Sequence, residues 1–323
     1  MSIKKQKKEM GLRGLNRFLR TNCQSNIRQI PLCELKGKTV VVDASIYMYR
    51  FQGDRQLIES MYQMIGILFH NGITPIFVFD GKPPPEKREL LEKRKHDKIV
   101  AEKKFKEIKR RIASATHDDS DVADLEAEAD QLRRQFVRIR ASDISDVKNL
   151  LHIMGISYYD SDGESDGICA KLVCKKHAFA CLSEDMDMFI YGCPRVLRYL
   201  SLLKSSVVMY DLRGIINSLR IPFKDFQSIC VLAGTDYNIL SNDNLYLNRA
   251  LKIYASYNKN RNDESYIEWA SKNNYIKDTE SFMKVLSMFD TTKVVIDRRC
   301  MTTSVYDKEK LRELLSDYGF VFP

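Results

Sequence analysis

The sequence predicts an α/β fold, in which a central, mostly parallel, twisted sheet is flanked by helices and carries a charged helical insertion and a helical C-terminal region. Two runs of β-branched and aromatic residues, Lys38–Asp43 and Thr74–Phe79 with the following Asp80, are typical of buried parallel strands. Between them, Leu57–His70 repeats its apolar residues at helical spacing. After the second run, Pro83-Pro84-Pro85 interrupts the pattern and opens a long polar segment.

The other expected elements follow the same two periodicities along the chain. Residues 11–30 predict an N-terminal helix and its exit, and Asn71-Gly72 predicts the turn into the second strand. A helix capped by Ser142 begins the second half of the fold. The elements expected there are helix Ser142–Met154, strand Ile156–Tyr159, a helix from about Glu164, strand Ala178–Leu182, a hairpin of Val196–Leu200 with Val207–Tyr210, helix Phe223–Ala233 and a mostly helical remainder from Leu245.

The polar segment from residue 82 to 140 is strongly charged. Residues 82–114 contain thirteen lysines or arginines against six acids, and residues 117–130 contain seven acids and no lysine or arginine. This composition predicts two charged helices that rise from the domain with an acidic tip between them, too polar to bury a core of their own. A disordered or coiled-coil insertion is the alternative that composition leaves open.

The net charge of +9 is spread unevenly, because residues 1–114 carry +13 and the remainder carries −4. A basic half beside many carboxylates suggests a polyanionic substrate held by lysines. The alternative is that the lysine-rich helices are only solvated, as most charged runs are.

Composition also indicates the compartment. No apolar run approaches the ~20 residues that span a bilayer, and the basic stretch Met1–Glu9 has no apolar signal-peptide core behind it. We therefore expect an intracellular protein whose eight cysteines are reduced thiols. A zinc site is not expected, because Cys169, Cys174 and Cys181 form no Cys-x-x-Cys pair.

Five short stretches rich in carboxylates stand out from this background. The two predicted strands lead to Asp43 and Asp80, and three later stretches hold six more acids: Gly163-Glu164-Ser165-Asp166, Ser183-Glu184-Asp185-Met186-Asp187 and Gly234-Thr235-Asp236. Ligands of open α/β sheets bind beyond the carboxyl ends of the strands, and acids gathered there repel one another unless a cation lies between them. A pair of hard ions such as Mg²⁺ satisfies that arrangement. The alternative is that each acid only caps a helix or a turn.

In order and spacing, several stretches of the chain are similar to those of one nuclease family. They are Met10-Gly11-Leu12-Arg13-Gly14-Leu15, Val42-Asp43-Ala44-Ser45, Phe79-Asp80-Gly81-Lys82-Pro83-Pro84, Leu182-Ser183-Glu184-Asp185-Met186-Asp187 and Gly234-Thr235-Asp236-Tyr237. On these residues the chain resembles the flap endonucleases, which are structure-specific 5′ nucleases, over nearly all of residues 10–240. The resemblance implies a nuclease domain there, preceded by a basic extension at 1–9 and followed at 241–323 by a divergent helix-hairpin-helix-like, DNA-binding helical region.

The resemblance also implies two Mg²⁺ ions, which Mn²⁺ could replace, bound by seven carboxylates. These are Asp43, Asp80, Glu164, Asp166, Asp185, Asp187 and Asp236. Glu184 has no ligand role by this match, and Asp166 stands where the family has a glutamate, one methylene longer. Glu164 and Asp166 are two residues apart, so they cannot share a helix face and must lie at a helix start or a bend.

Further side chains acquire roles through the resemblance. Lys87 and Arg94, seven residues and therefore two helical turns apart, match the basic pair that contacts the scissile phosphate. Tyr49 matches the aromatic residue on which the unpaired nucleotide stacks; without the resemblance it is an ordinary packed aromatic. Residues 82–140 match a helical arch and cap through which a free 5′ end threads, and we expect the acidic tip to face away from that strand.

The match weakens after Asp236. The family has a Gly-x-Gly hairpin there, which binds K⁺ and the duplex backbone, but Ser241–Arg249 contains no glycine. A K⁺ site is therefore not supported, and contacts with the duplex fall to Arg249, Lys252 and nearby asparagines. No sliding-clamp motif is found at the C-terminal end.

We therefore expect a Mg²⁺-dependent flap endonuclease that hydrolyses branched DNA near the junction of single strand and duplex during replication, repair or recombination. We expect it to act as a monomer, in the nucleus or at a cytoplasmic site of DNA replication. A 5′-to-3′ exonuclease or a gap- or junction-cutting relative is the alternative within the superfamily. A DNA-binding scaffold without chemistry is less compatible with the sequence, because all seven ligand acids are present.

Overall fold

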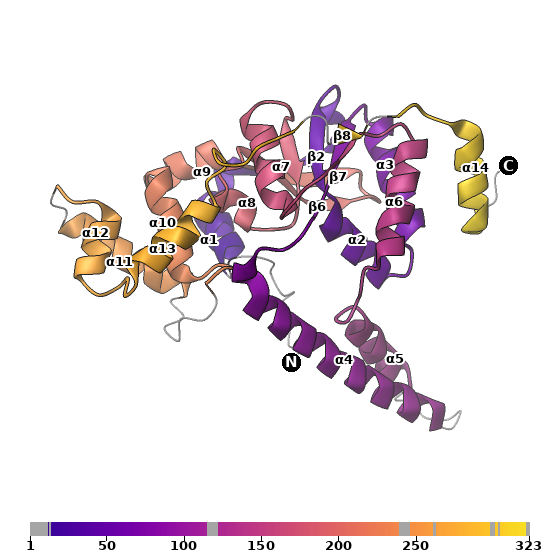
Figure 1. Ribbon diagram of the computed structural model, residues 1–323, viewed down its shortest axis with the longest axis horizontal. Helices are drawn as coiled ribbons and strands as arrows, with labels where there is room; N and C mark the ends of the chain where they lie inside the picture. The colour runs from indigo at the N-terminus through magenta and orange to yellow at the C-terminus, as the bar shows by residue number, and fades with distance from the viewer. Residues whose placement is uncertain are drawn as a thin grey trace.

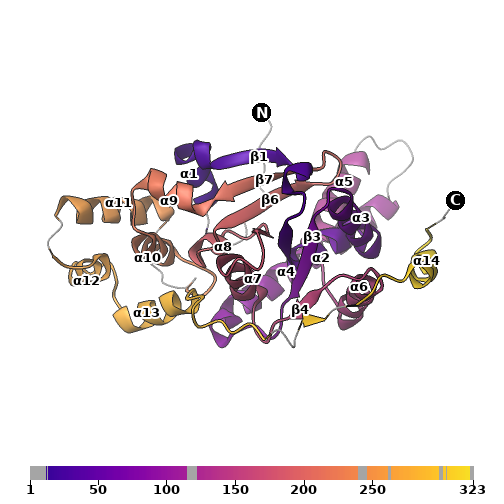
Figure 2. The same ribbon diagram turned by 90° about the horizontal axis from the view of Figure 1, so that it is seen from above.

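A computed structural model describes residue 12 and residues 14–114, 122–238, 246–260, 263–297, 301–302 and 304–320. Within these residues the chain builds a mixed sheet of eight strands (Figure 1 and Figure 2). The strands are β1 (Ile27–Pro31), β2 (Thr39–Asp43), β3 (Thr74–Phe79), β4 (Tyr158–Asp160), β5 (Ala180–Leu182), β6 (Arg195–Ser201), β7 (Ser206–Asp211) and β8 (Met301–Thr302). Their order is β1-β7-β6-β5-β2-β3-β4-β8, and the strands from β6 to β4 run parallel. The predicted parallel centre is confirmed.

Alternating side chains of the strands carry apolar groups to both faces of the sheet. In β2, Val41 packs into one core, while Val40 and Val42 pack into the other, as the side-chain period of two requires. Helices cover both faces (Figure 2). On the face of Val41 lie α1 (Leu15–Asn22), α7 (Ser165–Cys174), α8 (Asp187–Ile190), α9 (Leu212–Leu219) and α10 (Phe223–Ala233). On the opposite face lie α2 (Ala44–Gly53), α3 (Leu57–His70) and α6 (Ala141–Ile153).

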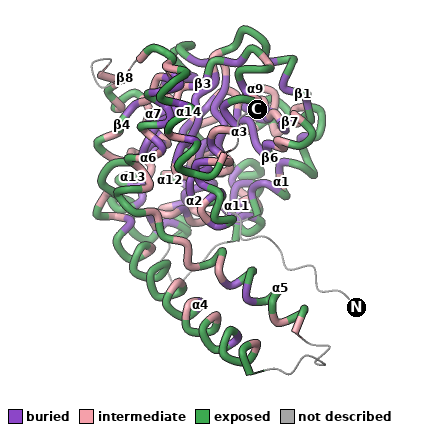
Figure 3. Tube along the Cα trace, turned by 90° about the vertical axis from the view of Figure 1, so that its right-hand side faces the viewer, coloured by how far each residue is buried: buried purple, intermediate pink, exposed green. Residues whose placement is uncertain are grey.

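Two helices, α4 (Arg88–Ser114) and α5 (Val122–Arg133), project from this body as a pair that we call the arch (Figure 3). Their charged surfaces are mostly exposed, but the two helices share a small apolar core. It consists of Ala101, Ile108, Ala129 and Leu132, with Phe105, Ile112, Leu125 and Phe136 packed against it. The expectation that this segment buries no core is wrong, because residues spaced by three, four and seven share one helix face that the second helix covers. Part of the acidic tip, residues 115–121, lies outside the described residues.

Some element boundaries differ from the predictions. Helix α6 begins at Ala141 and its N-cap is Arg140, so the expected Ser142 cap is wrong. The N–H of Arg140 donates to Asp143 Oδ2 at 2.7 Å. A carboxylate at the third helical position thus satisfies the N–H of the cap residue, as in one half of a capping box. Strand β4 begins two residues later than expected, at Tyr158.

The chain beyond α10 divides between the two ends of the body. Helices α11 (Leu247–Lys259) and α13 (Thr279–Met288) pack against α10, and α12 (Tyr266–Lys272) packs against α11 (Figure 1). The chain then returns to the sheet, where β8 pairs antiparallel with β4, and α14 (Lys308–Asp317) packs on α6. The sequence does not predict β8, because two residues carry no periodicity. Among the helices described, none combines the length and the apolar character needed to cross a bilayer.

Candidate active site

The carboxyl ends of β2 and β3 place two acids at one edge of the sheet. Asp43 is the last residue of β2 and Asp80 follows β3, and the two strands are parallel neighbours. Both carboxylates also accept backbone hydrogen bonds, Asp43 from Ile46 N at 3.4 Å and Asp80 from Ser165 N at 2.8 Å. The alternative interpretation, that these acids cap helices, therefore also holds: Asp43 accepts from α2 and Asp80 from the first residue of α7. These hydrogen bonds fix the direction in which the two carboxylates point.

The loop after β5 carries two more acids, Asp185 and Asp187, which are 9% and 2% exposed. Ser183 ties this loop to β2, because its hydroxyl donates to Asp43 Oδ2 at 3.1 Å and accepts from Asp185 N at 3.1 Å. Asp187 N donates to Asp185 Oδ1 at 2.8 Å, and Leu12 N donates to Asp187 Oδ1 at 3.2 Å. Sequence reasoning overlooks Ser183, although this residue opens the acid-rich stretch.

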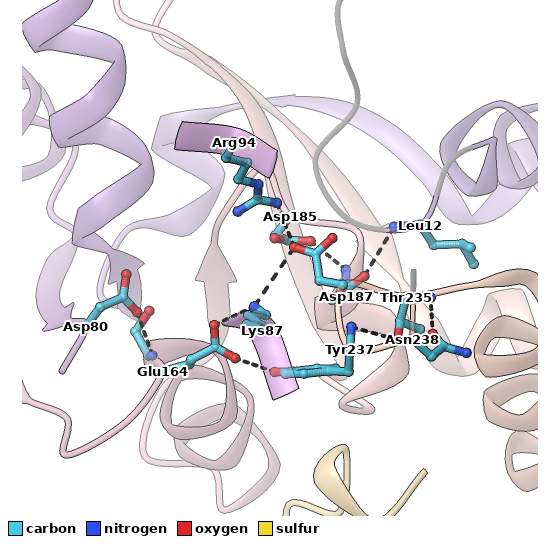
Figure 4. A network of polar contacts seen from close by, with 12 residues as sticks. Leu12, Asp80, Lys87, Arg94, Glu164, Asp185, Asp187, Thr235, Tyr237 and Asn238 are labelled. Atoms are coloured by element: carbon cyan, nitrogen blue, oxygen red, sulfur yellow. Dashed lines mark hydrogen bonds and ion pairs between the residues drawn. The ribbon is translucent and has the colours of Figure 1, made fainter. Parts of the chain in front are cut away.

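Two helix ends bring the remaining acids to the same place. Glu164 is the N-cap residue of α7 and Asp166 lies in the first turn, which is the helix start that their spacing predicts. Asp236 lies just beyond the end of α10. In Figure 4 the carboxylate of Glu164 lies between Lys87 and Tyr237 and accepts a hydrogen bond from each.

Burial and mutual repulsion perturb these carboxylates. Desolvation, together with the charges of Asp80 and Asp185, raises the pKa of Asp43 to about 8. Desolvation is also the main cause that raises the pKa values of Asp166, Asp185 and Asp187, and the charges of neighbouring acids add to it. Several of these acids are influenced by the charges of others, and with the two neighbouring acids they form what we call the acid cluster. It consists of Asp43, Asp80, Glu164, Asp166, Asp185, Asp187 and Asp236.

Lys87 reaches into the acid cluster from the foot of the arch. It ends the short 3₁₀ helix Pro85–Lys87, is 7% exposed, and forms an ion pair with Glu164. Its Nζ lies 3.9 Å from Asp236 Oδ2, and Arg94 Nη2 donates to the same oxygen at 2.7 Å (Figure 4). Burial alone lowers the pKa of Lys87, but the charges of Glu164 and of the other acids around it raise that pKa above its usual value. The ammonium group therefore stays protonated.

The donor set of the acid cluster suits hard cations. Of its seven carboxylates, Glu164 and Asp236 form ion pairs with Lys87 and Arg94. Oxygen-only donors are those that Mg²⁺ and Mn²⁺ prefer. Within the described ranges, no three acidic, histidine or cysteine side chains already converge as a cage for an ion. Asp43, Asp80, Asp185 and Asp187 accept instead from backbone N–H groups, and Glu164 and Asp236 pair with Lys87 and Arg94.

Tyr49 lies on α2 at the edge of the acid cluster. Its side chain is 45% exposed, and Lys98 Nζ of the arch lies 5.0 Å from its ring centroid. Burial, and after it the charge of Asp80, raise the pKa of Tyr49. The position suits an aromatic platform between the arch and the sheet.

The predicted duplex contacts, Arg249 and Lys252, are exposed on α11. They take no part in the hydrogen bonds and ion pairs given above for the acid cluster. Residues 241–245, more than half of the segment Ser241–Arg249 that replaces the family's hairpin, lie outside the described residues.

Tyr237 is a further site residue to which sequence reasoning assigns no role. Its hydroxyl donates to Glu164 and shares a hydrogen bond of 2.8 Å with the hydroxyl of Tyr191. Its ring lies beneath Lys87, with Nζ 4.8 Å from the ring centroid. Tyr237 therefore holds an acid and a cation of the site at once. The sequence feature that could have identified Tyr237 is its position directly after Asp236 in the stretch Gly234-Thr235-Asp236-Tyr237.

The metal-free protein is predicted to gain stability when Asp43 is replaced by asparagine. The pKa of Asp43 is about 8 in the folded protein against about 3.9 in an unfolded chain. The folded state therefore binds this proton more tightly, and the contribution of Asp43 to the free energy of unfolding falls as the pH rises between these values. Asparagine keeps an acceptor for Ile46 N and removes the charge. In EDTA near pH 8, calorimetry should show Asp43→Asn melting several degrees above the wild type.

The difference in melting temperature between Asp43→Asn and the wild type should disappear in EDTA near pH 4, where both side chains are neutral. Asp162→Asn, at an exposed position before α7, is the control and should leave the melting temperature unchanged. Equal melting temperatures of Asp43→Asn and the wild type at the higher pH would contradict the burial of an uncompensated charge.

Comparisons with protein families match two segments of the chain, and each segment contains acids of the cluster. Residues 10–101 match the XPG N-terminal domain, and residues 155–236 match the XPG I-region. Asp43 and Asp80 lie in the first segment. The other five acids of the cluster lie in the second.

Flap endonuclease 1 proteins are similar to most of this chain. That of Methanococcus aeolicus is 29% identical over 284 residues, which are 83% of this chain and 79% of that protein. Those of Drosophila mojavensis and Encephalitozoon cuniculi are each 30% identical, over 83% and 71% of this chain and 69% and 68% of their own lengths.

Solved structures share the fold. Flap endonuclease-1 from Methanococcus jannaschii is 24% identical and superposes with a TM-score of 0.64 over 90% of both chains. The catalytic core of Rad2 in complex with a DNA substrate gives a TM-score of 0.64 at 24% identity over 95% of both chains. Human GEN1 in complex with Holliday junction DNA gives 0.64 at 18% identity, over 96% of this chain and 74% of that chain. With the two family models and the sequence relatives, the conclusion is that this chain belongs to the flap endonuclease family of structure-specific 5′ nucleases, whose members depend on divalent metal ions.

Proposed function

We propose that the protein hydrolyses phosphodiester bonds of branched or flapped DNA near the junction of single strand and duplex, with two Mg²⁺ ions bound by the acid cluster. The observation that carries this proposal is the meeting of acids from five separate stretches with the two basic side chains at the foot of the arch. The proposed ligands are Asp43, Asp80, Glu164, Asp166, Asp185, Asp187 and Asp236.

We propose two ions because a cluster of seven carboxylates carries more negative charge than one divalent ion can neutralise. When bound, two such ions would supply an activated water and stabilise the leaving oxygen of a phosphodiester. We expect Mn²⁺ to substitute for Mg²⁺, because both ions accept the same oxygen donors.

The chain's own cations and Tyr49 handle the phosphate and the nucleotide. Lys87 is buried and is held in place by its ion pair with Glu164 and by the ring of Tyr237. Its ammonium group stabilises the negative charge that develops on the scissile phosphate. Arg94 supplies a second donor from the same side of α4. Tyr49 offers its exposed ring to the unpaired base, a contact that tolerates any sequence. In-line attack then leaves a 5′-phosphate and a 3′-hydroxyl.

The position of the arch favours a substrate with a free 5′ end. Lys87 lies directly before α4 and Arg94 lies in its first two turns, so a single strand that reaches the acid cluster would pass the start of this helix. Solved relatives were captured with DNA, Rad2 with a DNA substrate and GEN1 with a Holliday junction, which supports DNA as the substrate. A threaded 5′ flap suits the arch better than a four-way junction. A 5′-to-3′ exonuclease or gap nuclease is the second candidate.

The same proposal assigns a role to each part of the chain. We assign catalysis to residues 10–240, with the arch insertion at 82–140, and additional duplex contacts to the helices after residue 241, including Arg249 and Lys252 on α11. The protein acts as a monomer, in the nucleus or at a cytoplasmic site of replication.

A panel of DNA structures tests this function. Single-flap, double-flap, nicked, blunt-duplex and four-way DNA, each labelled at the 5′ end, would be incubated with the protein in Mg²⁺ or in EDTA. We expect release of the flap as one product in Mg²⁺ alone, and loss of that product when the 5′ end is capped by a bulky group. Release of mononucleotides from nicks or ends would favour the exonuclease. Binding of flap DNA without any cleavage would contradict both nuclease readings.

A further inference from the structure

Glu184 lies among the acids of the site, yet its contacts lead away from them. Tyr199 N, on β6, donates to Glu184 Oε1 at 2.6 Å. Glu184 Oε2 lies 3.7 Å from Arg198 Nε, and the two side chains are 21% and 4% exposed. Glu184 therefore joins the loop after β5 to the neighbouring strand β6.

Arg198 is a buried charge, 3% exposed, directly behind this loop. Its Nη2 donates to the backbone carbonyl of Glu184 at 2.8 Å, and its Nη1 lies 2.6 Å from Met186 Sδ. One guanidinium thus holds the residues on both sides of Asp185. It also lies over the ring of Tyr199, 4.9 Å from the centroid. A rigid fork of donors makes several fixed contacts at once, which a lysine cannot do.

Strand β6 departs from regular geometry at this contact. Tyr199 has a φ of +56°, and the pairing of β6 with β7 shifts register between Arg198 and Ser201. A positive φ is uncommon for a residue other than glycine, and bulges next to active sites re-aim the groups they carry. Here the irregular strand directs Tyr199 N to the carboxylate of Glu184. Arg198 and the irregular part of β6 therefore both contact the loop that carries Glu184.

We propose that Arg198 and Glu184 are positioning residues, which clamp the Ser183–Asp187 loop so that Asp185 and Asp187 face the metal ions. This inference rests on the proposed function of the acid cluster. The loop is also held by Ser183, whose hydroxyl donates to Asp43 and whose N–H donates to the carbonyl of Leu197, and by Leu12 N, which donates to Asp187. The clamp adds the side-chain contacts that hold the two residues on either side of Asp185, because Arg198 binds the carbonyl of Glu184 and contacts Met186. Such outer partners of metal ligands commonly change metal affinity by about 10–100-fold when they are removed.

Arg198→Met tests the clamp, with Arg195→Met as a matched control. Arg195 lies on the same strand, donates to the carbonyl of Phe179 at 3.3 Å and stacks over that ring at 4.4 Å, so its loss removes similar contacts from another place. Mn²⁺ binding would be measured by titration calorimetry without DNA, and the melting temperature in EDTA. We expect Arg198→Met to weaken Mn²⁺ binding by about tenfold or more, with Arg195→Met unchanged. Arg198→Lys should recover only part of the affinity.

Equal Mn²⁺ affinities for Arg198→Met and Arg195→Met would overturn the clamp, even if both proteins melted earlier than the wild type. If Arg198→Met does not fold, Glu184→Ala and Glu184→Gln decide the question. The glutamine keeps an acceptor for Tyr199 N, so it should retain more Mn²⁺ affinity than the alanine. Equal, wild-type affinities of these two would overturn the clamp. A wild type that binds no Mn²⁺ would instead overturn the metal site and the clamp with it.

Discussion

Asp185→Ala or Asp187→Ala is expected to slow cleavage of flap DNA by at least about a thousandfold, because each removes a carboxylate that orients an ion worth several kcal/mol to the transition state. Both side chains are buried in the acid cluster and are fixed by backbone hydrogen bonds from Asp187 N and Leu12 N. Binding of branched DNA should persist, since lysines and arginines elsewhere hold the phosphates. Single-turnover cleavage and fluorescence anisotropy in Ca²⁺ measure the two quantities separately.

The matched control for these variants is Asp162→Ala, which removes an exposed acid outside the cluster. It should cleave at the wild-type rate. Loss of DNA binding together with cleavage in Asp185→Ala would mean that the ions hold the substrate as well as cut it. Cleavage at the wild-type rate by either variant would remove that carboxylate from the proposed ligands.

Lys87→Ala is expected to slow the chemical step by about 10²–10³-fold, the usual loss when one fixed donor to a developing negative charge is removed. The side chain is buried and lies within ion-pair distance of Glu164 and Asp236, so it is fixed before the substrate arrives. Rapid-quench cleavage of a pre-formed complex at saturating Mg²⁺ isolates this step. DNA affinity should change much less than the rate.

Arg88→Ala is the control for Lys87→Ala, because it removes the next residue, whose side chain is 81% exposed and paired with Glu92 on the arch surface. Its cleavage rate should match the wild type. Equal single-turnover rates for Lys87→Ala and the wild type would count against a phosphate role for Lys87. Such a result would leave Lys87 only the task of neutralising Glu164 and Asp236 before ions bind.

Part of the site can be predicted from local sequence. Asp43 and Asp80 follow apolar runs of strand type, and parallel strands bring their carboxyl ends to one edge, so their meeting needs no knowledge of the rest of the fold. The spacing of Glu164 and Asp166 predicts a helix start, which α7 confirms. Family resemblance, rather than any periodicity, singles out Asp236, because nothing local distinguishes an acid that follows a helix from an ordinary turn residue.

Other parts of the fold are hidden from local patterns. Ala101, Ile108, Ala129 and Leu132 are too sparse to predict a core in the arch, and they become one only because α4 and α5 face each other. The role of Glu184 is equally hidden, since its partners Arg198 and Tyr199 belong to another strand. Burial of Ser183 and Tyr237 next to acids likewise depends on neighbours that the chain brings from elsewhere.

The chain alone is enough to predict an α/β class, two charged helices and a set of acids suited to divalent ions, because strand and helix periodicity and composition are local properties. The contacts that make a working site are not local. Lys87 meets Glu164 across 77 residues and Arg94 meets Asp236 across 142. These ion pairs exist only when the sheet has formed, and the same holds for the raised pKa of Asp43 and for the clamp of Arg198. The reason is that the folded chain brings the partners together and excludes water, and the exclusion of water strengthens the interactions between their charges.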